Sequence, residues 1–196
     1  MKFKLRPYQE EASKKAVEFF LDKKKNWNAL EVLPTASGKS LILADIAARL
    51  KDKVLVFSPT KEILEQNYKK YCSYGFDNAS IYSASFKSKE ISDVTFATIG
   101  SVKGHPELFT DFKYILIDEV HLVKPESGMY KEFLDKLKSK VIGLTATPFR
   151  LYSYQNYGSI LKFLTRSRDK IFKELIYYVK VEDMAKNGYI CLPNYY

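Results

Sequence analysis

Short apolar runs alternate with amphipathic segments along most of the chain, and this alternation predicts an α/β fold. The apolar runs, each bounded by polar or turn residues, are predicted strands at 29–33, 54–57, 79–82, 94–98, 114–117 and 141–144. Apolar residues at helical spacing predict helices over 7–22, 39–50, 61–74 and 129–137. Continuous apolar strands separated by helices indicate a central parallel sheet with helices on both faces.

Parallel sheets of this kind bind ligands at the carboxyl ends of their strands, so the loops after the predicted strands hold the candidate chemistry. The loop after the first strand reads Pro-Thr-Ala-Ser-Gly-Lys-Ser over residues 34–40 and runs directly into a helix. The free N–H groups and the dipole of a helix N-terminus attract phosphate. Lys39 can reach the β- and γ-phosphates of a nucleotide, and the Ser40 hydroxyl can ligate magnesium.

This loop is not a strict phosphate-binding motif, because Leu33 stands where the strict pattern has a glycine. A Gly-Lys-Ser tripeptide is common by itself and carries no function in most proteins. Its place between a predicted strand and a predicted helix is what favours a nucleotide site.

Two adjacent carboxylates, Asp118 and Glu119, follow the predicted strand 114–117. Carboxylates at the end of a buried strand are costly without a cation or hydrogen bonds. Magnesium carried by a nucleotide would supply the cation, with Asp118 holding the metal and Glu119 orienting and deprotonating the attacking water. The simpler interpretation is a solvated turn with a capping aspartate. The pairing with Lys39 on the same sheet edge favours the catalytic interpretation.

Composition and charge exclude few classes of protein or partner. The 196 residues fit one compact domain, and 46% are hydrophobic, enough for a sizeable core. The net charge of +9 is compatible with a polyanionic partner and equally with an ordinary basic enzyme. Cys72 and Cys191 form no metal-ligand pattern, and no apolar run is long enough for a membrane span. We therefore expect a cytoplasmic protein in a reducing compartment, with no membrane partner.

A third segment, Gly-Leu-Thr-Ala-Thr-Pro at 143–148, also follows a predicted strand. With it, the chain resembles the first RecA-like domain of superfamily-two helicases and translocases. Segments similar to that family's motifs stand in the family's order: the adenine-recognising element at 5–9, motif I at 34–40, motif Ia at 58–62 with Gln66, motif Ib at 98–102, the DExH box at 118–121 and motif III at 145–147. The resemblance covers nearly all of the chain and implies a RecA-like P-loop domain.

Within the superfamily, the chain is most similar to RadD-like bacterial DNA-repair helicases. The residues that carry this likeness are Arg-Pro-Tyr-Gln at 6–9, Gly-Leu-Thr-Ala-Thr-Pro-Phe-Arg at 143–150 and Ala-Lys-Asn-Gly-Tyr-Ile at 185–190. Motor subunits of restriction enzymes and the repair helicases related to XPB share much of this pattern.

The resemblance assigns nucleotide and metal roles residue by residue. ATP with Mg²⁺ would be bound by Arg6, Gln9, Thr35, Ala36, Ser37, Gly38, Lys39 and Ser40. Ser40 and Asp118 would hold the metal, and Lys39, Asp118 and Glu119 would be catalytic. Gln9 would read the adenine edge, to which a glutamine amide can both donate and accept, and Arg6 would pack near the base. Ordinary polarity at a helix N-terminus is the simpler account of both residues.

The same resemblance assigns coupling and nucleic-acid contacts. His121, Thr145 and Thr147 would relay the nucleotide state to the nucleic-acid face and to a second domain, although a lone histidine is more often a satisfied polar residue. Both threonines also suit a turn before Pro148. The sugar-phosphate backbone of a nucleic acid, DNA in preference to RNA, would meet Thr60, Lys61, Thr98 and Ser101. Each of these four residues also suits a helix cap.

Two residues depart from the family's pattern. Ala36 stands where glycine is usual, and an alanine there costs about 1 kcal/mol or more if the position has a positive φ. Val120 replaces the alanine or cysteine common in the DExH box, and we expect it only to pack.

The segment 151–170 combines tyrosines with basic residues, namely Tyr152, Tyr154, Tyr157, Lys162, Arg166, Arg168 and Lys170. Such residues can stack on bases, but a solvated helix with a tyrosine-lined core face is the favoured interpretation. We expect residues 1–180 to form the RecA-like ATP-binding domain. Residues 181–196 would connect it to a second RecA-like domain in cis, which lies outside this chain.

The leading hypothesis is therefore the ATP-binding first motor domain of a nucleic-acid-dependent ATPase, helicase or translocase that acts on DNA in repair or recombination. One alternative is the motor part of a restriction endonuclease. Another is a nucleotide-gated binding module without turnover, which the presence of Glu119 disfavours. A small-molecule kinase with a phosphate loop is disfavoured by the Thr-Ala-Thr segment and the Asp-Glu-Val-His box.

Overall fold

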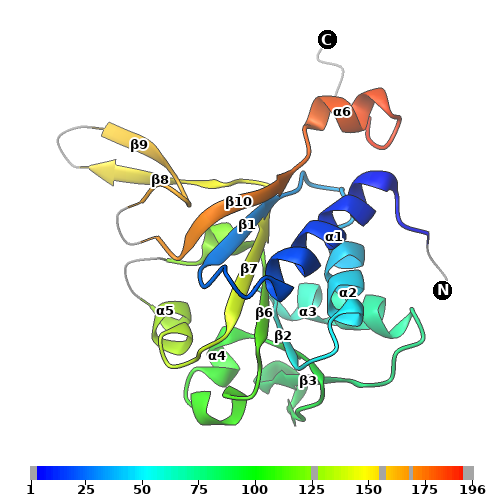
Figure 1. Ribbon diagram of the computed structural model, residues 1–196. Coiled ribbons are helices and arrows are strands. Elements are labelled where there is room, and N and C mark those ends of the chain that lie inside the picture. The colour runs from blue at the N-terminus through cyan, green and yellow to red at the C-terminus, as the bar shows by residue number, and fades with distance from the viewer. Residues whose placement is uncertain (1–3, 125–127, 155–157, 168–169, 192–196) are drawn as a thin grey trace.

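The computed structural model describes residues 4–124, 128–154, 158–167 and 170–191 (Figure 1). A sheet of eight strands forms its centre, in the order β10-β1-β7-β6-β2-β5-β3-β4. The strands are β1 (Asn28–Val32), β2 (Val54–Phe57), β3 (Ala79–Ser83), β4 (Ser88–Lys89), β5 (Val94–Ala97), β6 (Tyr114–Asp118), β7 (Lys140–Thr145) and β10 (Phe172–Tyr178). Neighbouring strands are parallel except for β3 and β4, which are antiparallel.

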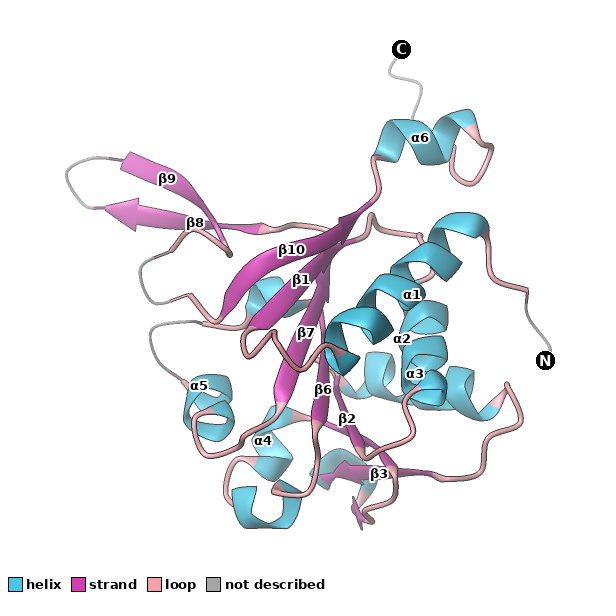
Figure 2. Ribbon diagram, in the orientation of Figure 1, coloured by secondary structure: helices cyan, strands magenta, loops and turns pink. Residues whose placement is uncertain are grey.

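Helices cover both faces of the sheet, so the α/β class predicted from the sequence is confirmed (Figure 2). One face carries α1 (Pro7–Leu21), α2 (Lys39–Arg49) and α3 (Lys61–Cys72). The other face carries the shorter helices α4 (Ile99–Val102) and α5 (Met129–Leu134). Helix α6 (Val181–Lys186) follows the edge strand β10. Single 3₁₀ turns lie at Ala84–Phe86, Pro106–Phe109 and Val120–Leu122.

Each central strand contributes to two cores, because successive side chains point to opposite faces of the sheet. In β2, Val54 and Val56 join the cluster beneath α1, α2 and α3, whereas Leu55 and Phe57 join the cluster beneath α4 and α5. All four side chains are fully buried. Burying one such side chain stabilises the fold by about 1.5–3 kcal/mol. This two-sided burial explains why these strands read as continuous apolar runs.

The boundaries of the predicted strands and helices agree with the structure to within a residue or two, except at the end of α5. Helix α5 ends at Leu134 rather than at Leu137, because the backbone there tightens into i to i+3 turns, with Leu137 N donating to Leu134 O at 3.1 Å. Strand β10 was not predicted. It lies along β1 and extends the parallel sheet beyond the strand that leads into the candidate phosphate loop.

The helix favoured within 151–170 is wrong. Strands β8 (Phe149–Tyr154) and β9 (Gly158–Phe163) form an antiparallel hairpin that projects from the body of the molecule (Figure 1). The pairing explains why, since Leu151 faces Leu161 in register while the adjacent pair is Arg150 with Lys162. Over the first three pairs, from Phe149 with Phe163 to Leu151 with Leu161, apolar and basic pairs thus alternate with the period of a strand rather than of a helix. Tyr157, Arg168 and the side chain of Tyr154 lie outside the described residues.

Two further sequence expectations concern thiols and membranes. Cys72 and Cys191 are both free. Within the described ranges, no helix combines the length and apolar character that a membrane span needs. The division into residues 1–180 and 181–196 stays a prediction.

Candidate active site

The sheet order brings the candidate loops to one edge. Strands β1, β7, β6 and β2 are consecutive parallel neighbours, so the loops that follow them lie side by side. Backbone bonds continue just past the strand ends: Leu33 N, after β1, donates to Thr145 O at the end of β7 at 2.9 Å, and Ser58 N, after β2, donates to Ala97 O at the end of β5 at 3.1 Å. The structure therefore assembles the loop 34–40, the acidic pair and the Thr-Ala-Thr segment at the same edge.

The loop 34–40 reaches α2 through two residues with positive φ. Ala36 has φ of +63°, and Gly38, which caps α2, has φ of +79°. The positive φ at position 38 favours glycine, and a Cβ there would lie 2.5 Å from Nε2 of Gln9, so that the Gln9 side chain would have to move. Ala36 meets the condition for backbone strain set out from the sequence, because the left-handed region disfavours any residue with a Cβ.

The loop is braced by the first turn of α1. Both Tyr8 Oη and Gln9 Nε2 donate to Ser37 O at 2.8 Å. Gln9 Oε1 accepts from Arg6 N at 2.9 Å, and the Gln9 side chain is almost fully buried. The Gln9 amide therefore ties α1 to the loop, and its role in reading an adenine edge stays a prediction.

Asp118 ends β6 in a buried, hydrogen-bonded position, with only 4% of the residue exposed. Asn67 Nδ2 of α3 donates to Asp118 Oδ2 at 3.0 Å and to Ser58 Oγ at 3.0 Å, and Glu119 N donates to Asp118 Oδ1 at 3.0 Å. Burial raises the pKa of the Asp118 carboxyl, the bond from Asn67 opposes the rise, and the charge of Glu119 adds to it. A cation beside this carboxylate would lower its pKa again.

A chain of polar contacts links three of the loops. Lys39 Nζ lies 3.2 Å from Glu119 Oε1, and His121 Nδ1 lies 3.4 Å from Glu119 Oε2. The same His121 nitrogen lies 2.9 Å from Thr145 Oγ1. The phosphate-loop lysine is thus connected through the acidic box to the Thr-Ala-Thr segment.

The series of polar contacts continues toward the β8–β9 hairpin. Thr147 N donates to Thr145 Oγ1 at 3.0 Å, and Thr145 Oγ1 donates in turn to Thr147 O at 3.2 Å. Arg150 Nε donates to His121 O at 2.7 Å. The residues expected to couple the site to other parts of the molecule are therefore in contact with one another.

Val120 packs directly on β7. A Cβ at Gly143 would lie 2.7 to 2.8 Å from three carbons of the Val120 side chain, and Val120 is fully buried. Val120 packs as the sequence predicted. The larger valine in the box fits because the facing residue is glycine.

The residues expected to contact nucleic acid lie at the ends of two adjacent strands, β2 and β5. Thr60 caps α3, accepting from Ile63 N at 3.4 Å, and the Lys61 ammonium stands 5.0 Å from the centroid of the Phe86 ring. Thr98 Oγ1 lies 3.0 Å from Ser101 Oγ, which accepts from Ala84 N. Thr60 and Lys61 are exposed, whereas the Thr98 and Ser101 hydroxyls are partly engaged in local bonds.

The residues present fit a nucleotide that brings its own metal. Among the described residues, no group of three or more His, Cys, Asp and Glu side chains could hold a metal ion by itself. The loop, however, carries a buried Ser37 hydroxyl that lacks a hydrogen-bond partner within the described part of the chain. Ser40 stands in the first turn of α2, and Asp118 lies at the same sheet edge. These oxygen donors suit Mg²⁺ bound jointly with phosphate.

Sequence reasoning missed three residues that support this site: Tyr8, Asn67 and Arg150. Only Asn67 left a readable signal. It shares the buried face of α3 with Leu64 and Tyr71, and a polar residue on a buried face must find a partner. The partners of Tyr8 and Arg150 depend on tertiary contacts.

The chain is similar in sequence to known proteins. Residues 2–150 match the family described as "Type III restriction enzyme, res subunit". The DNA 3'-5' translocase XPB2 of Sulfurisphaera tokodaii is 31% identical over 152 residues, which cover 76% of this chain and 32% of that protein. The chain therefore spans about a third of the length of this curated relative.

Solved structures show the same fold. The UvsW helicase from bacteriophage T4 aligns with a TM-score of 0.64 at 21% identity, over 89% of this chain and 60% of that one. A nuclease-deletion mutant of the Type ISP restriction-modification enzyme LlaGI, in complex with a DNA substrate mimic, aligns with a TM-score of 0.67 at 19% identity, over 95% of this chain and 21% of that one. At these identities the likeness concerns the fold alone.

Proposed function

The chain belongs to the family of the type III restriction enzyme res subunit, and from this premise we propose that it is the ATP-binding first motor domain of a DNA-dependent helicase or translocase. One observation carries the proposal. At the carboxyl ends of three different strands, one continuous series of side-chain contacts joins Lys39, Glu119, His121 and Thr145. The turns that follow buried strands do not need such a series of polar side-chain contacts in order to fold.

In the proposed reaction, each residue of the site has a defined task. Bound ATP with Mg²⁺ supplies the transferable phosphoryl group and the cation that neutralises it. Lys39 holds the β- and γ-phosphates, and Ser40 and Asp118 ligate the metal. Glu119 accepts the proton of the attacking water. Arg6 and Gln9 bind the base, and the backbone of 35–38 faces the phosphates.

His121, Thr145 and Thr147 transmit the nucleotide state. His121 contacts both Glu119 and Thr145, and this supports the role. A movement of Glu119 when the γ-phosphate binds or leaves would pass through His121 to the Thr-Ala-Thr segment. A second RecA-like domain in cis is the expected recipient. DNA rather than RNA is the expected substrate, and the name of the translocase matched at 31% identity supports that choice.

The finer assignment is to a RadD-like DNA-repair helicase, on the motif likeness at 6–9, 143–150 and 185–190. The alternative is the motor part of a restriction endonuclease, which the family's own description supports. A nucleotide-gated binding module without turnover is less well supported, because Glu119 stands beside Lys39 in the position of a general base.

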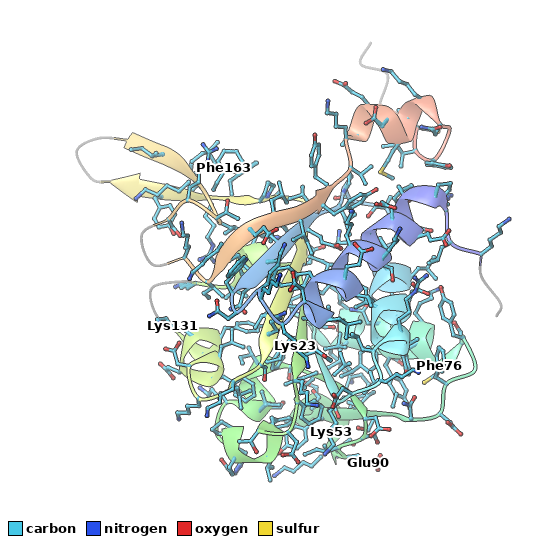
Figure 3. All side chains as sticks on the ribbon, viewed as in Figure 1. Lys23, Lys53, Phe76, Glu90, Lys131 and Phe163 are labelled. Atoms are coloured by element: carbon cyan, nitrogen blue, oxygen red, sulfur yellow. The ribbon has the colours of Figure 1, made fainter. Side chains whose placement is uncertain are left out.

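Titration with labelled ATP and Mg²⁺ tests the proposal. Lys39→Ala removes the charge that faces the phosphates and is expected to weaken ATP binding by about 2 kcal/mol or more, about thirtyfold. Lys23→Ala is the matched control, since Lys23 is an exposed lysine in the turn after α1 (Figure 3). Equal affinities of the wild type and Lys39→Ala would refute the nucleotide site.

A further inference from the structure

The segment after α6 folds back in a fixed geometry. Gly188, with φ of +68°, ends the helix, and Gly188 N donates to Ala185 O at 2.9 Å while Tyr189 N donates to Met184 O at 2.8 Å. This pair of bonds is a Schellman motif, which turns the chain sharply at a glycine. Met184 is buried and anchors the helix. The position of Tyr189 therefore follows from the Asn-Gly-Tyr sequence.

Tyr189 lies against the N-terminal turn that braces the phosphate loop. The Cζ atom of Arg6 stands 4.7 Å from the centroid of the Tyr189 ring, and Arg6 Nη1 donates to Tyr189 O at 3.4 Å. The rings of Tyr8 and Tyr189 are 5.3 Å apart. Arg6 is thus held at its backbone by Gln9 and at its side chain by Tyr189.

The Arg6 side chain remains exposed although its Cζ atom lies over the Tyr189 ring. A guanidinium group is planar and stacks on aromatic rings with either face. Tyr8 and Gln9, the neighbours of Arg6 in the same turn, both donate to Ser37 of the phosphate loop. The open face of Arg6 therefore belongs to the part of the site where a nucleotide base, rather than its phosphates, is expected.

We propose that Tyr189 is a positioning residue for the nucleotide base. Its ring holds the Arg6 guanidinium flat, so that a purine stacks on the opposite face of that group. The segment that follows α6 is thereby tied to occupancy of the base site. This inference rests on the proposed ATP site, and it adds a residue from the far end of the described chain to base recognition.

Competition binding separates a base effect from a general effect on the site. The affinities of Mg²⁺-ATP and of inorganic tripolyphosphate are measured for the wild type, Tyr189→Phe, Tyr189→Ala and Phe163→Ala. Phe163 is an exposed aromatic residue on the hairpin, on the opposite side of the view from α6, and serves as the control (Figure 3). A small cavity of about 180 Å³ already lies beside Tyr189, between Tyr8 and Met184. Because Met184 is buried, we expect it to keep α6 anchored when the ring is lost.

Tyr189→Ala is expected to weaken ATP binding about threefold to tenfold and to leave tripolyphosphate binding unchanged, because only the base loses its support. Tyr189→Phe keeps the ring and is expected to bind ATP as the wild type does. In an Arg6→Ala background, Tyr189→Ala is expected to add nothing, since the two residues act through one stack.

Three results would overturn the inference. Unchanged ATP affinity in Tyr189→Ala, together with a large loss in Lys39→Ala, would leave the ATP site in place and remove Tyr189 from it. Equal weakening of ATP and tripolyphosphate would show that Tyr189 supports the phosphate loop instead of the base. If the wild type bound neither Mg²⁺-ATP nor tripolyphosphate, the proposed function would be overturned, and with it this role of Tyr189.

Discussion

Lys39 Nζ lies 3.2 Å from Glu119 Oε1, so the phosphate-loop lysine and the proposed general base form an ion pair. Both side chains are shielded, with 11% and 25% of their surfaces exposed. A bound triphosphate draws the lysine toward its β- and γ-phosphates, so nucleotide binding competes with this pair. The ion pair between Lys39 and Glu119 is therefore expected to oppose ATP binding.

Glu119→Gln is expected to bind Mg²⁺-ATP about threefold to tenfold more tightly than the wild type, because the amide releases Lys39 from a pair worth about 1 kcal/mol. The same change removes the proton acceptor and is expected to abolish phosphate release. Titration with labelled ATP and a phosphate-release assay measure the two effects. Glu65→Gln, at an exposed position of α3, is the control. Weaker ATP binding by Glu119→Gln would show that the pair does not compete with the nucleotide.

Ala36→Gly is expected to be neutral or to raise the free energy of unfolding by up to about 1 kcal/mol. The φ of +63° at Ala36 costs an L-residue about 1–2 kcal/mol, and the extra chain entropy of glycine offsets part of the relief. Ala48→Gly, inside α2, is the control and is expected to destabilise the protein by about 1 kcal/mol. Urea unfolding of both variants decides. Equal destabilisation would mean that the strain at Ala36 is absent in solution.

The sequence predicted those parts of the structure that local physics controls. Strands such as β2 are apolar on both faces, which indicates a buried parallel sheet. Helical spacing of apolar residues begins directly after the Gly-Lys-Ser turn, which indicates the start of α2. Lys39 and Asp118 could therefore be assigned to one edge of the sheet. The β8–β9 hairpin was missed because the basic residues Arg150 and Lys162 stand among tyrosines and apolar residues. In the sequence alone this mixture does not show a clear period of two.

Contacts between distant residues could not be read in advance. Asn67 and Asp118 are 51 residues apart, and Arg6 and Tyr189 are 183 apart. Such pairs follow from strand order and helix docking, which a single sequence specifies only through the complete fold. The residue types at the site were therefore predictable, but the side chains that support them were not.

Glu31, in β1, makes stability depend on pH. The residue is fully buried, and neither carboxyl oxygen has a hydrogen-bond partner among the described residues. Burial raises its pKa well above the ordinary value of 4.5. The pKa of the nearby Tyr177 is raised by burial and by the charges of Glu11 and Glu31. The folded chain thus holds the Glu31 proton more tightly than the unfolded chain, so this group's contribution to stability is lost as pH rises through its folded-state pKa.

Glu31→Met keeps approximately the length of the side chain and removes the titrating group. The variant is expected to gain stability over the wild type as pH rises, by about 1.4 kcal/mol for each pH unit between the unfolded and folded pKa values. At about pH 4 the Glu31 carboxyl is mostly protonated in both the folded and the unfolded chain. The wild type and Glu31→Met are therefore expected to differ least in stability at that pH. Urea unfolding across this pH range measures the difference. A constant difference at all pH values would show that Glu31 is hydrated or paired in solution.

DNA binding is expected to be weak, independent of sequence and strongly dependent on salt, because it rests on phosphate contacts and a net charge of +9. Lys61→Ala is expected to weaken binding evenly across sequences and to reduce the slope of log affinity against log salt by about 1. Lys23→Ala is the control. Fluorescence anisotropy with single-stranded and duplex DNA and with RNA measures both effects. A sharp sequence preference, or an affinity insensitive to salt, would contradict the assignment.

Residues 1–196 are expected to bind ATP but to hydrolyse it very slowly. The arginines that the structure describes each have another partner. Arg6 stacks on Tyr189, Arg49 pairs with Asp45, Arg150 donates to the His121 carbonyl, and Arg166 stands over the ring of Phe163. An arginine that stabilises the transferring phosphoryl group is worth about 10³ to 10⁵ in rate. In the proposed motor, a second RecA-like domain supplies that arginine.

Glu119 can therefore activate water while the charge that develops on the phosphoryl group stays under-stabilised, and turnover on the order of 10⁻³ s⁻¹ or slower is expected. DNA is not expected to raise this rate, because stimulation acts by closing two domains around the nucleotide. Steady-state phosphate release is measured with and without single-stranded DNA, duplex DNA and RNA, beside Glu119→Gln and Arg150→Ala. Rapid turnover abolished by Glu119→Gln would show that residues 1–196 hold a complete catalytic site. If Arg150→Ala also abolished that turnover, Arg150 would be the stabilising arginine, released from His121 when ATP binds.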